Sequence, residues 1–136
     1  MKLAQLYYKT YVERQQLHQP DVLGHFDLIR LFGLMPTDSK AYLDLATDAL
    51  FTCLKITPVM EINMVPMVLR GDSEPYPRTN ILKEAVAHGA KLVLSSDAHK
   101  VENLTRGFDD EILRLKAIGV KEIVQFVGKR FVEVGI

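Results

Sequence analysis

Apolar residues recur along the chain with two alternating periods, one typical of helices and one typical of buried strands. Helical spacing predicts helices over residues 3–18, 40–50, 77–88 and 108–118. Short apolar runs predict strands at residues 21–26, 58–63, 91–95 and 122–127, with a further extended piece at 131–134. Between the second strand and the third helix, prolines and a glycine predict a long loop over residues 64–76.

This alternation of strands and helices predicts an α/β fold with parallel strands joined by crossover helices. Four or five strands cannot close a barrel, which generally requires about eight. The pattern therefore leaves two architectures open, a small open α/β domain or part of a larger barrel.

Composition narrows the class of protein. The chain has 136 residues, enough for one domain of ordinary size, and its formal net charge is zero. Because no block of basic residues and no apolar run of roughly 20 residues occurs, we expect neither a nucleic-acid partner nor a membrane partner. The single cysteine, Cys53, cannot form an internal disulfide, so we expect a reducing, cytoplasmic location and a small buried side chain.

The stretch Ser95–His99 carries the clearest chemical signal. It follows a predicted strand, and its two candidate metal ligands, Asp97 and His99, are two residues apart. In an extended segment both side chains leave the same face, and a carboxylate with an imidazole suits zinc, manganese or iron. The alternative is an ordinary loop in which Asp97 caps a turn and His99 faces water.

Two other predicted strands also end in polar residues, the first in His25 and Asp27 and the second in Glu61 and Asn63. If the strands are parallel, His25 can join Asp97 and His99 around one metal ion, with water in the fourth position. The metal would lower the pKa of this water so that hydroxide forms near neutral pH, and hydroxide can attack a phosphate ester. Candidates for binding the phosphate are Arg70, Arg78 and Lys100, although charged residues of this kind are more often solvated on the surface than bound to a substrate.

Simpler interpretations exist for several of these residues. His25 could bond a loop carbonyl, and Asp27 is expected to cap the following segment rather than to bind a metal. Glu61 lies between apolar neighbours, so it should meet a cation, a hydrogen-bond donor or water.

Four motifs occur in a recognisable order: Gly24–Leu28 (GHFDL), Glu61–Asn63 (EIN), Tyr76–Pro77 and Ser96–Lys100 (SDAHK). Together they resemble the histidinol-phosphate phosphatases of the PHP (polymerase and histidinol phosphatase) superfamily. The resemblance extends over nearly the whole chain. It implies a partial (β/α) barrel of the PHP type here, with about four parallel strands and crossover helices.

The resemblance also implies a function. It implies a metal-dependent phosphomonoesterase of histidine biosynthesis, with histidinol phosphate as the substrate and a divalent zinc, manganese or iron cofactor. His25, Asp97 and His99 match family metal ligands. Arg70 matches a family phosphate-binding position, Glu61 matches a position beside the substrate, and Lys100 is kept as a phosphate contact.

The family opens with a His-x-His motif, and this sequence contains none. We therefore expect residues 1–136 to be a single PHP-like domain that corresponds to the C-terminal portion of the enzyme. Two functions follow, an active phosphatase or a non-catalytic half-barrel that needs another chain to complete its site. A proofreading domain of a polymerase is a weaker third alternative. An unfinished barrel also predicts homo-oligomers that associate through exposed sheet edges.

Overall fold

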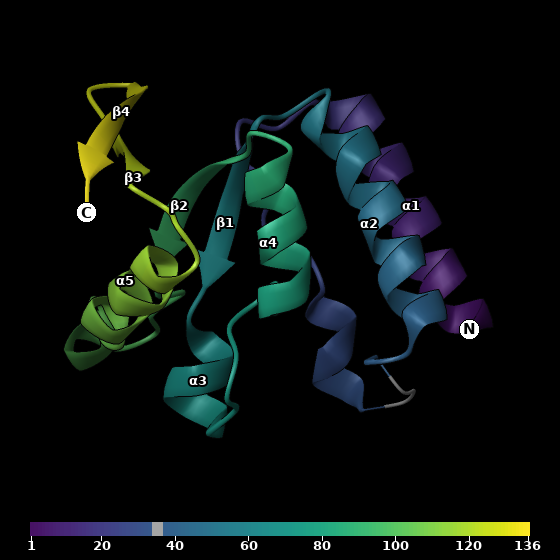
Figure 1. Cartoon of the computed structure of the whole chain (residues 1–136), viewed down its shortest axis with the longest axis horizontal. Coiled ribbons are helices and arrows are strands. Elements are labelled where there is room, and N and C mark those ends of the chain that lie inside the picture. The colour runs from purple at the N-terminus through teal and green to yellow at the C-terminus, as the bar shows by residue number, and fades with distance from the viewer. Residues whose placement is uncertain (34–36) are drawn as a thin grey trace.

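Two long helices, α1 (Lys2–His18) and α2 (Lys40–Leu54), lie side by side at one end of the molecule (Figure 1). The computed structural model describes residues 1–33 and 37–136. Both helices agree with the predicted periodicity. The side-chain oxygen of Ser39 accepts a hydrogen bond of 3.3 Å from the amide of Tyr42 and so caps the N-terminus of α2.

The remaining elements continue away from these helices. In chain order the structure contains η1 (Leu28–Phe32), β1 (Val59–Asn63), α3 (Val65–Arg70), α4 (Thr79–Ala87), β2 (Lys91–Ser95), η2 (Val101–Asn103), α5 (Phe108–Ala117), β3 (Glu122–Val127) and β4 (Arg130–Gly135). The core lies between α1, α2, α4 and β1, and includes the fully buried Tyr8, Tyr42, Leu50 and Ile62. Cys53 is buried in it as expected.

Strands β1 and β2 pair in parallel, with Val59 opposite Lys91 and Asn63 opposite Ser95. The predicted strand at residues 21–26 is mostly a turn, but its Leu23 forms an isolated parallel bridge to Met60 on β1. The carboxyl ends of these neighbouring segments consequently lie at one edge. This parallel arrangement confirms the geometric assumption on which the predicted site depends.

The expected fold class, a partial barrel with about four parallel strands, is wrong, because only β1 and β2 form a parallel sheet in the part of the chain that the structure describes. Strands β3 and β4 form an antiparallel hairpin, in a sheet separate from β1 and β2, so four parallel strands of a partial barrel do not occur in the described chain. The connection between them consists of only Gly128 and Lys129, both with positive φ (57° and 68°). Such a two-residue turn joins antiparallel strands, whereas a parallel crossover needs a dozen or more residues.

The prediction of a loop throughout residues 64–76 is also wrong, because Val65–Arg70 forms helix α3. Pro66 lies at the start of this helix, where the amide hydrogen that proline lacks would have no acceptor within the helix. The helix ends at Gly71, whose φ of 71° is the left-handed conformation typical of a C-terminal cap. Two of the residues that suggested a loop, Pro66 and Gly71, therefore begin and end a short helix.

Helix α5 contacts α4 through the Arg114 side chain, which also forms an ion pair with Glu111 on its own helix. The Glu111 carboxylate is fully buried and lies 3.2 Å from the Arg114 guanidinium, which also donates to the Thr79 hydroxyl at 2.6 Å. Burial raises the pKa of Glu111, and the positive charge of Arg114 opposes that rise only in part. The carboxyl group is therefore harder to ionise in the folded protein than in the unfolded chain.

This shift predicts a pH-dependent contribution to stability. Because the folded pKa is raised, the contribution of Glu111 is fully present below its unfolded pKa of about 4.3 and is lost as pH rises through the folded value. Urea unfolding between pH 4 and 8 should therefore show a free energy of unfolding that falls with pH relative to Glu111→Gln. The exposed control Glu102→Gln should follow the wild-type profile; equal profiles for wild type and Glu111→Gln would contradict the assignment.

Among the residues that the structure describes, no helix combines the length and the apolar character needed to cross a membrane.

Candidate functional site

Polar side chains from three segments meet beyond the carboxyl ends of the parallel pair. His25 follows the Leu23 bridge, Glu61 and Asn63 belong to β1, and Asp97 follows β2. We call these four residues the His25 cluster. Because parallel strands end at the same edge, residues 72 positions apart, His25 and Asp97, come within hydrogen-bond distance.

The His25 imidazole lies between two carboxylates. Its Nε2 is 3.2 Å from Asp97 Oδ2, and its Nδ1 is 3.4 Å from Glu61 Oε2. The His25 amide also donates a 2.7 Å hydrogen bond to the same Glu61 oxygen. The His25 side chain is 45% exposed, so a molecule in solvent can reach it. Glu61 has the hydrogen-bond donors that the sequence required of it.

Asn63 joins the two carboxylates, a role that the sequence analysis missed. Its side-chain nitrogen is 3.4 Å from Glu61 Oε1 and 3.3 Å from Asp97 Oδ2. Its side-chain oxygen accepts from the Val65 amide at 3.0 Å, which fixes the orientation of the side chain. The available signal was a second polar residue in a strand whose five residues are all buried.

His99 lies next to this cluster but does not complete it. Its Nδ1 is 2.9 Å from the backbone oxygen of Asp97. Since a carbonyl oxygen only accepts, Nδ1 carries a proton in this contact, and in the neutral ring the lone pair then lies on Nε2. This is the tautomer that metal-binding histidines usually adopt, held by a second partner.

The geometry of the His25 cluster matches the predicted metal site only in part. His25 Nε2 and Asp97 Oδ2 are separated by 3.2 Å. Two ligands of one tetrahedral ion with bonds near 2 Å lie roughly 3.3 Å apart. In residues 1–33 and 37–136, however, no group of three or more histidine, cysteine, aspartate or glutamate side chains is arranged to hold a metal ion. The described residues thus provide two donors with suitable spacing and do not form a complete three-ligand site.

The predicted phosphate contacts lie outside the cluster. Arg70 ends α3 and Lys100 follows Asp97 in the chain, and both side chains are exposed. Arg70 lies close enough to Tyr76 to lower the pKa of its phenol, although burial raises that pKa overall. Tyr76 in turn pairs with Asn63 through two backbone hydrogen bonds of 2.8 and 3.0 Å. Arg70 is therefore near the site, and its contact with a phosphate stays a prediction.

Asp27 does not act as the predicted helix cap. It occupies the N-cap position of η1, but its side chain makes no capping hydrogen bond and is fully buried. Its carboxylate is hydrogen-bonded by the hydroxyls of Tyr8 and Tyr42 and lies 3.3 Å from Arg30 Nη1. Burial raises the pKa of Asp27, and the Tyr42 hydroxyl and the Arg30 guanidinium oppose the rise.

The alternative interpretation of Arg78 as a solvated charge is also wrong. Its side chain is only 11% exposed, and its Nε is 3.5 Å from Asp27 Oδ2. Its guanidinium also donates to the backbone oxygen of Thr37 at 2.7 Å. These contacts occupy Arg78 within the protein, so its function is to hold the segment around Asp27 rather than to bind a phosphate.

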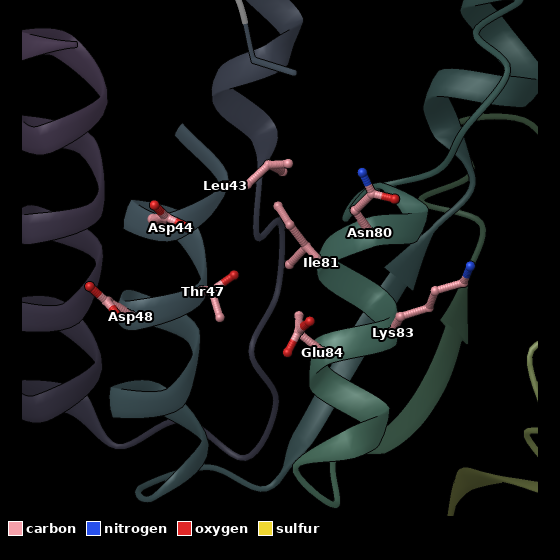
Figure 2. Close-up of a pocket in the computed structure, with 8 residues that line it drawn as sticks. All are labelled: Leu43, Asp44, Thr47, Asp48, Asn80, Ile81, Lys83 and Glu84. Atoms are coloured by element: carbon pink, nitrogen blue, oxygen red, sulfur yellow. The ribbon is translucent and has the colours of Figure 1, made fainter. Parts of the chain in front are cut away.

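A polar groove of about 660 Å³ lies elsewhere, between α2 and α4 (Figure 2). It is lined by Leu43, Asp44, Thr47, Asp48, Asn80, Ile81, Lys83 and Glu84. Figure 2 shows the Lys83 side chain extending away from α2. None of its lining residues belongs to the His25 cluster, so this groove is separate from the candidate site.

The fold and the cluster define an α/β protein with a histidine–carboxylate site at the carboxyl ends of parallel segments. The chain is similar to a probable histidinol-phosphatase of Schizosaccharomyces pombe, with 36% identity over 92 residues. The similarity covers 62% of this chain and 29% of the relative, so the chain spans less than a third of the relative's length. No protein-family model matches the chain.

Proposed function

We propose that the chain is a phosphomonoesterase of the histidinol-phosphatase type that acts on histidinol phosphate. The observation that carries the proposal is the 3.2 Å approach of His25 Nε2 to Asp97 Oδ2 across separate strand ends. The similarity to a probable histidinol-phosphatase supports the same chemistry. Glu61 and Asn63 support it further, because they hold both partners of the pair by hydrogen bonds.

In the proposed reaction a water oxygen forms a bond to phosphorus while the ester bond to the alcohol breaks. The departing alcohol oxygen takes up a proton, and the attacking water loses one. A half-exposed imidazole oriented by carboxylates is suited to moving a proton in this way. Asp97 and Glu61 orient the ring from its two sides, and Asn63 keeps the carboxylates in place.

The experiment that tests the proposal is phosphate release from histidinol phosphate by the purified chain. We expect release above the rate without protein. Metal dependence stays a prediction and is measured in the same assay by adding Zn²⁺ or Mn²⁺, or EDTA in a parallel sample. No step of the proposed reaction is assigned to a metal, because the described residues do not form a three-ligand group.

A second proposal is a non-catalytic half that needs another polypeptide to complete the site. The incomplete ligand group of the described residues favours it. It predicts no phosphate release under any metal condition. It also predicts self-association through the β3–β4 hairpin, where Phe126 is 61% exposed. Phosphate release by the monomeric fraction from size-exclusion chromatography would contradict this second proposal.

A further inference from the structure

Helix α1 presents three tyrosines, Tyr7, Tyr8 and Tyr11, to the segment that carries His25. Tyr11 donates a 2.8 Å hydrogen bond to the backbone oxygen of Gly24, and Tyr7 donates one of 3.1 Å to the backbone oxygen of His25. We call these three residues the tyrosine cluster.

The tyrosine cluster also contacts Phe26 and Asp27, the next two residues of the segment. The Phe26 ring packs against Tyr8 and Tyr11, with ring centroids 5.4 and 5.2 Å away. The Tyr8 hydroxyl lies 3.3 Å from Asp27 Oδ1. Each of the four consecutive residues 24–27 therefore contacts a tyrosine of one helix.

This segment needs such support because of its backbone conformation. His25 and Asp27 have φ values of 53° and 69°, in the left-handed region that residues other than glycine rarely adopt. Conformations of this kind persist only where surrounding contacts determine them. The backbone oxygens of Gly24 and His25 are the atoms that the tyrosines bond, so the contacts act directly on the strained part of the chain.

The tyrosines remain donors across the ordinary pH range. Burial raises the pKa of Tyr7 to about 12 and moves the pKa of Tyr11 still further above its usual value. Both hydroxyls therefore stay protonated at neutral pH and keep their hydrogen bonds to carbonyl oxygens.

We infer that Tyr7 and Tyr11 are positioning residues that hold the His25 imidazole against Asp97. This inference rests on the proposed function only in that His25 is taken as the residue that transfers the proton. The tyrosines do not touch the imidazole. They act through the backbone oxygens on either side of the His25 α-carbon, and so determine the direction in which its side chain leaves the chain.

The test is an NMR measurement of the His25 ring in the full chain, assigned with His25→Gln. The quantity is the shift of the ring Cε1–Hε1 signal caused by Asp97→Asn. In the otherwise unchanged protein we expect a clear shift, because the two side chains are 3.2 Å apart. In the double variant Tyr7→Phe/Tyr11→Phe, the added Asp97→Asn substitution should shift this signal by less than half as much. The matched control is Tyr76→Phe, whose buried hydroxyl has no hydrogen-bond partner among the described residues, and it should keep the full shift.

The outcomes separate positioning from simple stabilisation. A lower melting temperature of the double variant with an undiminished shift would mean that the tyrosines only anchor α1, which overturns the inference. If the double variant does not fold, Tyr11→Phe alone is used, since it keeps the ring against Phe26 and removes one bond. No shift in the unchanged protein overturns both the inference and the His25–Asp97 pair. A normal NMR result without phosphate release overturns the proposed function alone.

Discussion

Replacement of Asp27 by alanine is expected to lower the free energy of unfolding by about 3–5 kcal/mol, the cost of removing one partner from a buried ion pair. The Asp27 carboxylate is fully buried between two arginines, Arg30 and Arg78, whose side chains are only 12% and 11% exposed. Without it both guanidinium groups lose this carboxylate while remaining largely shielded from water. The hydroxyls of Tyr8 and Tyr42 also lose an acceptor.

Urea unfolding at neutral pH measures this effect. Asp27→Asn retains the size of the side chain and one acceptor oxygen, so its loss should lie between those of wild type and Asp27→Ala. The exposed Asp21 provides the matched control, and Asp21→Ala should change stability by less than about 0.5 kcal/mol. A loss below about 1 kcal/mol for Asp27→Ala would show that the arginines find water or other partners.

Replacement of His25 by glutamine is expected to lower the rate of phosphate release by about 100-fold or more, the usual effect of a general acid–base group. The glutamine amide nitrogen can still donate to Asp97, and the backbone amide of residue 25 keeps its bond to Glu61, but glutamine cannot transfer a proton at neutral pH. Stability should change little, because the His25 side chain is 45% exposed. The measurement is the initial rate of phosphate release at saturating histidinol phosphate, together with the urea midpoint of each variant.

The control for this prediction is His18→Gln, an exposed histidine at the end of α1. It makes the same chemical change outside the cluster and should retain the full rate. If His25→Gln keeps more than half of the wild-type rate, His25 does not transfer the proton. Asp97→Asn then becomes the informative variant, since it removes the charge beside the ring and leaves the imidazole intact.

The sequence predicted which residues of the His25 cluster lie at strand ends, but it did not predict how they are connected. The sequence placed His25, Glu61 and Asp97 at strand ends, and the parallel pairing of β1 and β2 brings these ends together. The connecting role of Asn63 was missed, because it depends on distances to residues on two other segments. The fit of His99 to a metal could not be judged from spacing, since it depends on where one ring nitrogen points.

Local periodicity by itself determined the helices α1, α2, α4 and α5, the strands β1 and β2, and the polar residues at their ends. These features follow from neighbours within a few residues, so a single sequence is sufficient. Only the tertiary structure decided that β3 and β4 form an antiparallel hairpin, that Asp27 is buried between two arginines, and that the tyrosines of α1 hold the segment around His25. Each of these depends on strand direction or on partners distant in the chain, and contacts of that kind exist only after the core has packed.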